Sequence, residues 1–346
     1  MYFVRIRNMW PCWKRYLLYL FFPNERQASI FSGIYLVIYN LCSIDCRCME
    51  SNRAIRQKFI LVYSSFLYLG PYVSGRYPFC WTLQRLVFKR KEAENMINTV
   101  MFDMGGTLEE LESNQKTAEN VISHIYEKLA EKGVSIKDPK EQFWNKVIDG
   151  RVKYKTYSQE CKRELKPEQI WSDWIFKNLN IETNIIYEIA EELAHMWEVT
   201  YFERRLRKGA KEMLRCLKQE GYKLSIISNT ASLYQVFKSL ENYGIREYFE
   251  DVTLSSITGY RKPHPEIYKI AMHQVKSKPE ECVFVGDRIS KDILGAKNAK
   301  LGASIQLLPK ESYKMDELLK DTVRSDYEIT DIFEVVEIMK KINGRG

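Results

Sequence analysis

The chain has 346 residues and a mass of 41.0 kDa, with 45% hydrophobic and 28% charged residues. This balance excludes collagen-like, disulfide-scaffold and wholly disordered chains, and the length indicates about two domains. The formal net charge of +8 is uneven: residues 1–95 carry 14 Lys and Arg against 5 Asp and Glu, and residues 96–346 carry 39 against 40. The basic excess is therefore confined to the first quarter, and we expect no nucleic-acid partner.

Residues 1–95 form an atypical basic segment that holds 20 of the 45 aromatic residues. Uncharged runs at 27–44 and 59–75 are at the short limit for crossing a bilayer, where about 20 residues are usual. Their flanks are equally positive and predict no orientation. Three interpretations stay open: an over-extended gene start with the true start at Met96, a segment that binds a membrane through residues 1–75, or a soluble extra domain.

From Met96 onward, short apolar strands alternate with helical patterns, which predicts an α/β fold with a parallel sheet. The expected strands lie at 98–102, 223–227, 251–254, 282–285 and 303–307. The expected helices between and after them lie at 208–220, 265–275, 289–299 and 331–342. A helix is also expected to open directly at Ser228, Asn229 and Thr230.

Between the first two strands the pattern is only helical, with expected helices at 115–132, 139–157, 167–179 and 183–198. We therefore expect a core made of residues 96–111 and 207–346. An all-helical insert at 112–206 would interrupt this core after its first strand.

Polar residues follow the expected strands at the points where those strands end. Asp103 follows the first strand, Ser228 the second, and Asp287 the fourth, with Asp292 five residues later; Lys262 lies in the loop after the third. Ligands of open parallel sheets bind at the carboxyl ends of the strands, so we expect these side chains to converge.

The residue types in this group suit phosphoryl transfer. A carboxylate such as Asp103 can attack phosphorus and form an aspartyl-phosphate. Asp103 and Asp287 would hold Mg²⁺, a cation that prefers oxygen ligands. Lys262 and Ser228 would neutralise and orient the phosphoryl oxygens.

The four ordered motifs, Asp103 to Thr107, Ser228, Lys262, and Gly286-Asp287 to Asp292, resemble those of the haloacid dehalogenase (HAD) superfamily over residues 98–343. The resemblance implies a Rossmann-like core, a helical cap of the dehalogenase, β-phosphoglucomutase and small-phosphatase subgroup, bound Mg²⁺, and hydrolysis of a small phosphorylated metabolite. It also implies a catalytic role for Thr107, substrate binding by Ser228, Asn229 and Lys262, and support of the metal by Asp292.

One position departs from the family motif Asp-x-Asp-Gly-Thr, because Gly105 replaces the second Asp. In the family that carboxylate protonates the leaving oxygen and then activates water, a contribution of about 10²–10⁴-fold. The family also uses the backbone carbonyl here as a metal ligand, which Gly105 keeps. The expectation is a phosphatase; the alternative is a phosphate-binding or regulatory protein with little turnover.

Simpler structural roles compete with the catalytic ones. Asp103 suits a turn, Ser228 and Asp287 suit helix caps, and an acid at Asp292 suits the first turn of a helix. The few scattered cysteines after residue 96 suit a reducing cytoplasm, so we expect a cytoplasmic protein, with membrane association as the alternative. The sequence leaves the oligomeric state open.

Overall fold

The computed structural model describes residues 96–309 and 313–344. The three interpretations of residues 1–95, including membrane binding, lie outside the described residues. Among the described helices, none combines the length and the hydropathy that a bilayer crossing requires.

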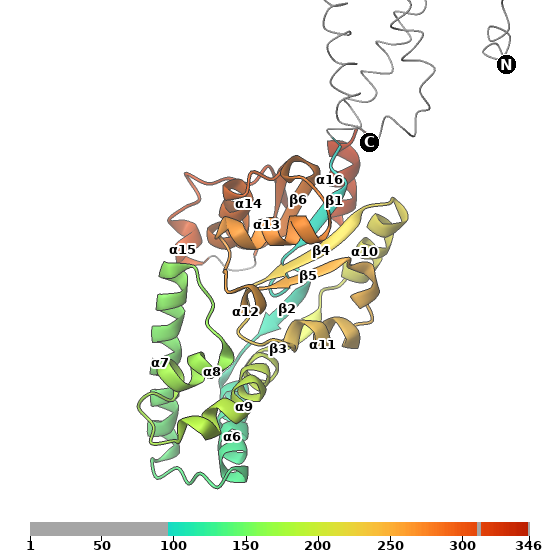
Figure 1. Cartoon of the computed structure of the whole chain (residues 1–346). Helices are drawn as coiled ribbons and strands as arrows, with labels where there is room; N and C mark the ends of the chain where they lie inside the picture. Colours follow the sequence, from blue (N-terminus) through green and yellow to red (C-terminus); the bar gives the residue numbers. More distant parts are fainter. Residues whose placement is uncertain (1–95, 310–312, 345–346) are drawn as a thin grey trace, which may run out of the picture. The chain divides into compact units, whose positions relative to one another are not determined.

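Six parallel strands form the central sheet in the order β5-β4-β1-β6-β7-β8. Four of them, β5, β4, β1 and β6, are labelled in Figure 1. They are β1 (Thr99–Phe102), β4 (Lys223–Ser228), β5 (Asp251–Leu254), β6 (Cys282–Gly286), β7 (Ala303–Leu307) and β8 (Tyr327–Ile329). The five strands expected from the sequence are confirmed. β8 is an addition at the edge, and it buries only Ile329, which is too little apolar pattern to recognise in a sequence.

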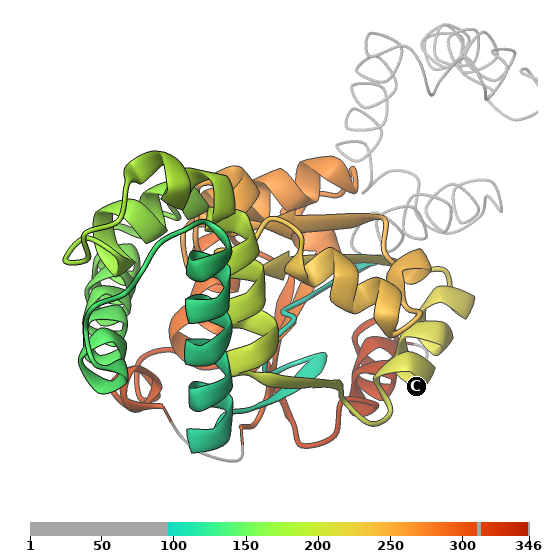
Figure 2. The ribbon, with the colours of Figure 1, turned by 90° about the horizontal axis from the view of Figure 1, so that it is seen from below.

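Alternate residues of the strands supply two apolar layers, as the two-residue period of a strand requires. Val100 and Phe102 pack with α10 (Ala210–Gln219), α11 (Gln235–Asn242) and α16 (Glu334–Ile342). Met101 packs on the opposite face with α13 (Pro265–Gln274) and α14 (Leu294–Asn298). Helices cover both faces in Figures 1 and 2, which confirms the Rossmann-like α/β class.

Short helical segments complete the core. Two are short α-helices, α12 (Ser255–Thr258) and α15 (Lys314–Glu317). The others are the 3-10 turns η5 (Arg246–Tyr248) and η6 (Pro279–Glu281) and the π-helical turn η7 (Ile289–Ile293). The expected helix at 289–299 is therefore divided between η7 and α14.

The inserted region is mainly helical and has an apolar core of its own (Figure 1). It contains α6 (Gln115–Glu131), α7 (Lys140–Cys161), α8 (Pro167–Ile170), η3 (Trp171–Ile175), α9 (Thr183–Met196) and η4 (Trp197–Tyr201). Its core is rich in aromatic side chains: Trp171 and Phe143 are fully buried, and Trp197 is nearly so. We call this region the cap.

The cap joins the core through an antiparallel ribbon of β2 (Glu109–Glu112) and β3 (Glu203–Leu206). The expectation that residues 112–206 contain no strand is therefore wrong at its end. The sequence of β3 is Glu-Arg-Arg-Leu, so the residues that alternate in exposure along it are almost all charged. Such a sequence has no apolar alternation from which a strand could be predicted. The helix expected to open at Ser228 also differs: a loop follows β4, and α11 begins at Gln235.

Candidate active site

The structure brings four of the predicted side chains to the carboxyl edge of the sheet. Asp103 follows β1, which lies between β4 and β6, and Asp287 follows β6. Ser228 is the last residue of β4, and Lys262 lies in the loop between α12 and α13. All four are buried, as is Asp292. The sheet order therefore explains why residues up to 189 positions apart in the sequence converge.

Lys262 is the cation at the centre of this group. Its Nζ lies 2.5 Å from Asp103 Oδ1 and 2.7 Å from Asp292 Oδ1. Burial alone would lower the pKa of Lys262, but the charges of Asp103 and Asp292 outweigh it and raise that pKa. The two carboxylates therefore favour the charged form of Lys262, which suits it to holding phosphoryl oxygens.

Three carboxylates lie close together at this edge of the sheet. One oxygen each from Asp103, Asp287 and Asp292 lies within 4.8 Å of the others. Burial and the neighbouring carboxylates Asp292 and Asp103 raise the pKa of Asp287 to about 8. Burial also raises the pKa of Asp103, against the opposing effect of Lys262.

The three carboxylates fit a divalent cation. Asp287 Oδ1 is buried and has no hydrogen-bond partner among the described residues. Such an oxygen is costly to bury unless something binds it. The three acids and Lys262 together carry a surplus of two negative charges when ionised. Hard cations prefer this donor set of oxygens.

Two glycines allow the loops to approach this closely. A Cβ on Gly106, whose φ is +95°, would lie 2.6 Å from Asp287 Oδ2. A Cβ on Gly286 would lie 2.4 Å from the Asp292 Cβ. Real Cβ atoms do not approach other atoms so closely, so both positions require glycine for the acids to reach the site.

Gly105 lies beside the β2–β3 ribbon. A Cβ placed there would lie 3.1 Å from Leu111 Cδ1 and 3.7 Å from Arg204 Nη1. A side chain at this position would therefore point toward the junction between core and cap. The predicted carbonyl contact of Gly105 with a metal stays a prediction.

Thr107 is fully buried, and its Oγ1 has no hydrogen-bond partner among residues 96–309 and 313–344. The loop that carries it is braced by Arg207, a residue that sequence analysis missed. Arg207 donates from Nε to the Thr107 carbonyl at 2.7 Å and from Nη2 to the Gly106 carbonyl at 2.7 Å. Arg207 and Thr107 are 100 residues apart in the sequence, and no local pattern indicates such a contact.

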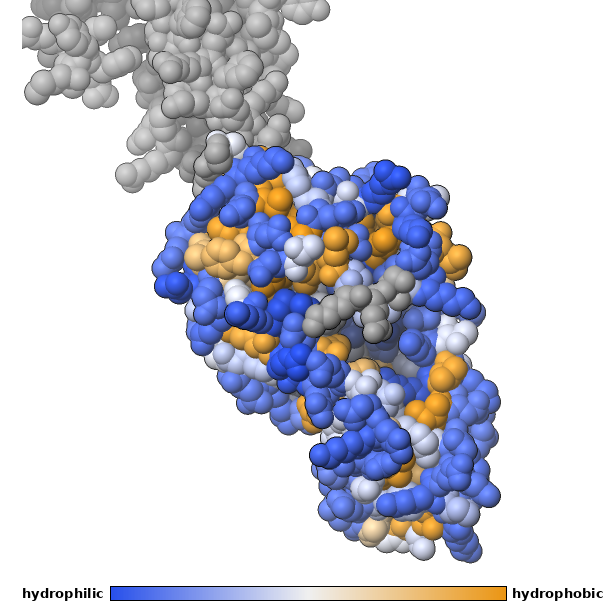
Figure 3. Space-filling view, turned by 180° about the vertical axis from the view of Figure 1, so that it is seen from behind, coloured by the Kyte–Doolittle hydropathy of each residue, from blue (hydrophilic) through white to orange (hydrophobic). Residues whose placement is uncertain are grey.

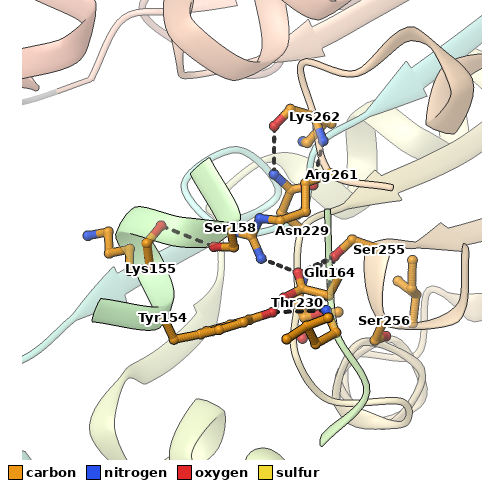
Figure 4. A network of polar contacts seen from close by, with 12 residues as sticks. Tyr154, Lys155, Ser158, Glu164, Asn229, Thr230, Ser255, Ser256, Arg261 and Lys262 are labelled. Atoms are coloured by element: carbon orange, nitrogen blue, oxygen red, sulfur yellow. Dashed lines mark hydrogen bonds and ion pairs between the residues drawn. The ribbon is translucent and has the colours of Figure 1, made fainter. Parts of the chain in front are cut away.

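The side chain of Asn229 forms two hydrogen bonds with the backbone of Lys262. Its Oδ1 accepts from the Lys262 N–H at 2.8 Å, and its Nδ2 donates to the Lys262 carbonyl at 3.1 Å. This pair fixes the loop that presents the Lys262 side chain (Figure 4). The predicted contact of Ser228 and Asn229 with substrate stays a prediction.

Comparison with known proteins shows the family of the chain. A family model described as haloacid dehalogenase-like hydrolase matches residues 97–300. Glyceraldehyde 3-phosphate phosphatase of Pyrococcus furiosus is 34% identical over 173 residues, which cover 50% of this chain and 70% of that protein. The enzyme of the same name from Methanocaldococcus jannaschii is 37% identical over 126 residues, which cover 36% of this chain and 53% of that protein.

A solved structure shares the fold. The crystal structure of a 2-haloacid dehalogenase from Pseudomonas syringae matches with a TM-score of 0.51 at 19% identity. The match covers 71% of this chain and 99% of that one.

Proposed function

The chain belongs to the haloacid dehalogenase-like hydrolases, and from this premise we propose that it is a Mg²⁺-dependent phosphatase of small phosphorylated metabolites. Asp103 is its nucleophile, and Lys262 and Ser228 bind the phosphoryl group. The observation that carries the proposal is the convergence of three buried carboxylates at one edge of the sheet. Two of them pair with the buried Lys262, and Asp287 Oδ1 still lacks a partner among the described residues.

The reaction proceeds in two displacements. In the first, the Asp103 carboxylate attacks phosphorus, and the bond from phosphorus to the substrate oxygen breaks. In the second, water attacks the aspartyl-phosphate, and inorganic phosphate leaves with Asp103 restored. Lys262 stays protonated throughout and neutralises the charge on the equatorial oxygens.

Asp103, Asp287 and Asp292, with the Gly105 carbonyl, are the residues proposed to hold the metal. When bound, Mg²⁺ supplies positive charge that offsets the carboxylates and the phosphoryl oxygens. The cap excludes bulk water from the site when it is closed. In Figure 3 the surface is mostly hydrophilic and is hollowed where the core meets the cap.

Gly105 favours one alternative, a phosphate-binding or regulatory protein with little turnover. Residue 105 lacks the carboxylate that would protonate the leaving oxygen, a loss of about 10²–10⁴-fold. Phosphate and metal binding do not depend on that carboxylate. We therefore expect slow turnover, and the alternative applies if turnover is absent.

The phosphatase proposal is tested by Mg²⁺-dependent phosphate release from a panel of phosphomonoesters that includes glyceraldehyde 3-phosphate. The full chain is compared with Asp103→Asn. Release that is lost in Asp103→Asn and in excess chelator supports the proposal. Equal release by both proteins, or none from a folded parent that binds phosphate, favours the alternative.

We also propose a cytoplasmic location. The three described cysteines, Cys161, Cys216 and Cys282, are free thiols, which suits a reducing compartment. Membrane association through residues 1–75 would be detected by fractionation of the full-length protein.

A further inference from the structure

A segment of the cap outside the ribbon makes a second connection with the core. The Glu164 N–H donates to the Gly259 carbonyl at 3.1 Å, and the Arg261 N–H donates to the Lys162 carbonyl at 3.0 Å. These bonds pair residues 162–164, which follow α7, with residues 259–261 of the core. The segment of the core that receives the cap therefore ends at the residue directly before Lys262.

The side chain of Glu164 is the buried centre of this connection. It is fully inaccessible to solvent. Its carboxylate accepts hydrogen bonds from Tyr154 of α7, from Ser255 Oγ at 2.7 Å, and from Arg261 Nη1 (Figure 4). Arg261 balances its charge. A buried carboxylate that forms an ion pair and two further hydrogen bonds has a defined geometry.

Two of these contacts lead directly to the phosphate-binding loops. Arg261 is adjacent to Lys262 in the chain. Ser255 Oγ also accepts from the Thr230 N–H at 2.9 Å, and Thr230 lies two residues after Ser228. Glu164 is therefore linked to both loops, each through a single intermediate residue.

Ionisation of the tyrosine partner does not disturb this arrangement. Burial and the adjacent Glu164 carboxylate raise the pKa of Tyr154 well above its ordinary value. Tyr154 therefore stays a donor, and its oxygen also accepts from the Leu165 N–H at 3.1 Å. Tyr154 therefore holds Glu164 from the cap, and Ser255 and Arg261 hold it from the core.

We propose that Glu164 is a positioning residue through which the docked cap holds the loops of Lys262 and Ser228 in their phosphate-binding arrangement. The inference rests on the proposed phosphatase site. It adds that the site is complete only when the cap supplies this carboxylate. Glu164 itself touches neither substrate nor the reacting atoms.

The variant Glu164→Gln tests this, because the amide keeps the shape and one acceptor oxygen but loses the ion pair with Arg261. The matched control is Glu160→Gln, an exposed glutamate near the end of α7. For each full-length protein we would measure the Kd of inorganic phosphate with Mg²⁺, kcat and KM for the best ester, and Tm.

We expect Glu164→Gln to weaken phosphate binding and to lower kcat, each by about 10- to 100-fold, because small displacements of positioned groups are costly. Glu160→Gln should match the parent. Arg261→Gln should cause a similar loss, and the double variant should be about as impaired as the worse single variant, because both remove one shared contact.

A lower Tm with unchanged phosphate Kd and unchanged kcat would overturn the proposal, since it would assign Glu164 a purely structural role. If Glu164→Gln does not fold, Ser255→Ala removes the link to Thr230 without leaving an unpaired charge, and the same losses are expected from it. If the parent shows no turnover, the phosphatase proposal fails, but the phosphate Kd still tests Glu164.

Discussion

Two of the ionic clusters near the junction of core and cap differ in whether their buried carboxylate oxygens have partners. At the sheet edge, Asp103 and Asp292 pair with Lys262, and the adjacent Asp287 has an Oδ1 with no partner among the described residues. The second cluster, at the β2–β3 ribbon, joins Arg204 to Glu109 and Glu198, two glutamates that lie apart in the sequence.

In the ribbon cluster, both carboxylate oxygens of the buried Glu109 have partners among the described residues. Arg204 Nη1 lies 2.6 Å from Glu109 Oε2, and Arg204 Nη2 pairs with Glu198. Tyr243 donates to the second Glu109 oxygen at 3.0 Å. Burial opposes the charge on Arg204, but Glu198 and Glu109 raise its pKa above the ordinary value. Buried charge by itself therefore does not mark a site; a buried carboxylate oxygen that lacks a partner among the described residues does.

The largest expected effect is at the sheet edge, where one substitution should lower the activity and raise the stability. Asp103→Asn should lower phosphate release by at least about 10³-fold, because it removes the proposed nucleophile. The Tm of the metal-free protein should rise, since one of three crowded carboxylates is gone. A calorimetric scan in chelator checks this, and a lower Tm would contradict the unbalanced charge described for the cluster.

The ribbon cluster should respond in the opposite way. Arg204→Met leaves the buried Glu109 and the half-buried Glu198 without their cation and should lower the free energy of unfolding by about 3–5 kcal/mol. Arg205→Met is the matched control, because the adjacent Arg205 is 53% exposed and pairs with Glu110 and Glu112 at the surface. That change should cost about 0–1 kcal/mol in urea unfolding. Similar losses for both variants would remove the distinction.

Gly105→Asp should raise kcat by about 10²-fold if the missing carboxylate limits turnover. We expect the lower end of the usual range, because Arg204 is near enough to favour the ionised carboxyl. Leu111 must move slightly, which the tip of a leucine side chain allows. Gly105→Asn controls for shape, and equal rates for the two variants would show that proton transfer is not limiting.

The smallest effect concerns pH. The pKa of Asp287 in the metal-free protein is raised to about 8, above its unfolded value. Protonated Asp287 therefore makes its full contribution to the free energy of unfolding at low pH. This contribution is lost as the pH rises through about 8. Mg²⁺ binding needs the ionised form and should tighten over the same interval.

Thermal unfolding in chelator at pH 6 and pH 8.5, with Mg²⁺ titrations at both, measures this. Asp287→Asn should flatten the pH dependence of Tm. A metal-free Tm that increases between these pH values would contradict the assignment.

The residues of the candidate active site were predictable because each one is marked by its neighbours in the sequence. Asp103, Ser228 and Asp287 each follow an apolar run, and parallel strands place all such ends on one edge. The order of motifs then identified the family. Most helices of the cap were also visible as apolar residues at helical spacing. The helix expected at 167–179 is instead the short α8 followed by the π-helical η3, and it ends at Ile175.

The connections between the two parts were not predictable from local pattern. β2 and β3 are four-residue strands of charged sequence, paired across more than 90 residues. Arg207 and Glu164 act at loops far away in the sequence, and each resembles an ordinary surface charge. Long-range polar contacts leave no periodic signal, so the structure was needed to find them.

The ribbon also determines whether the cap can be separated from the core. Glu112 and Glu203, the ends of the inserted region, are paired partners in one antiparallel ladder. A tight turn of two residues is enough to join such partners. The 90 residues between them are therefore a removable module: a chain closed at this point would keep the strand order of the core while exposing Asp103 to bulk water.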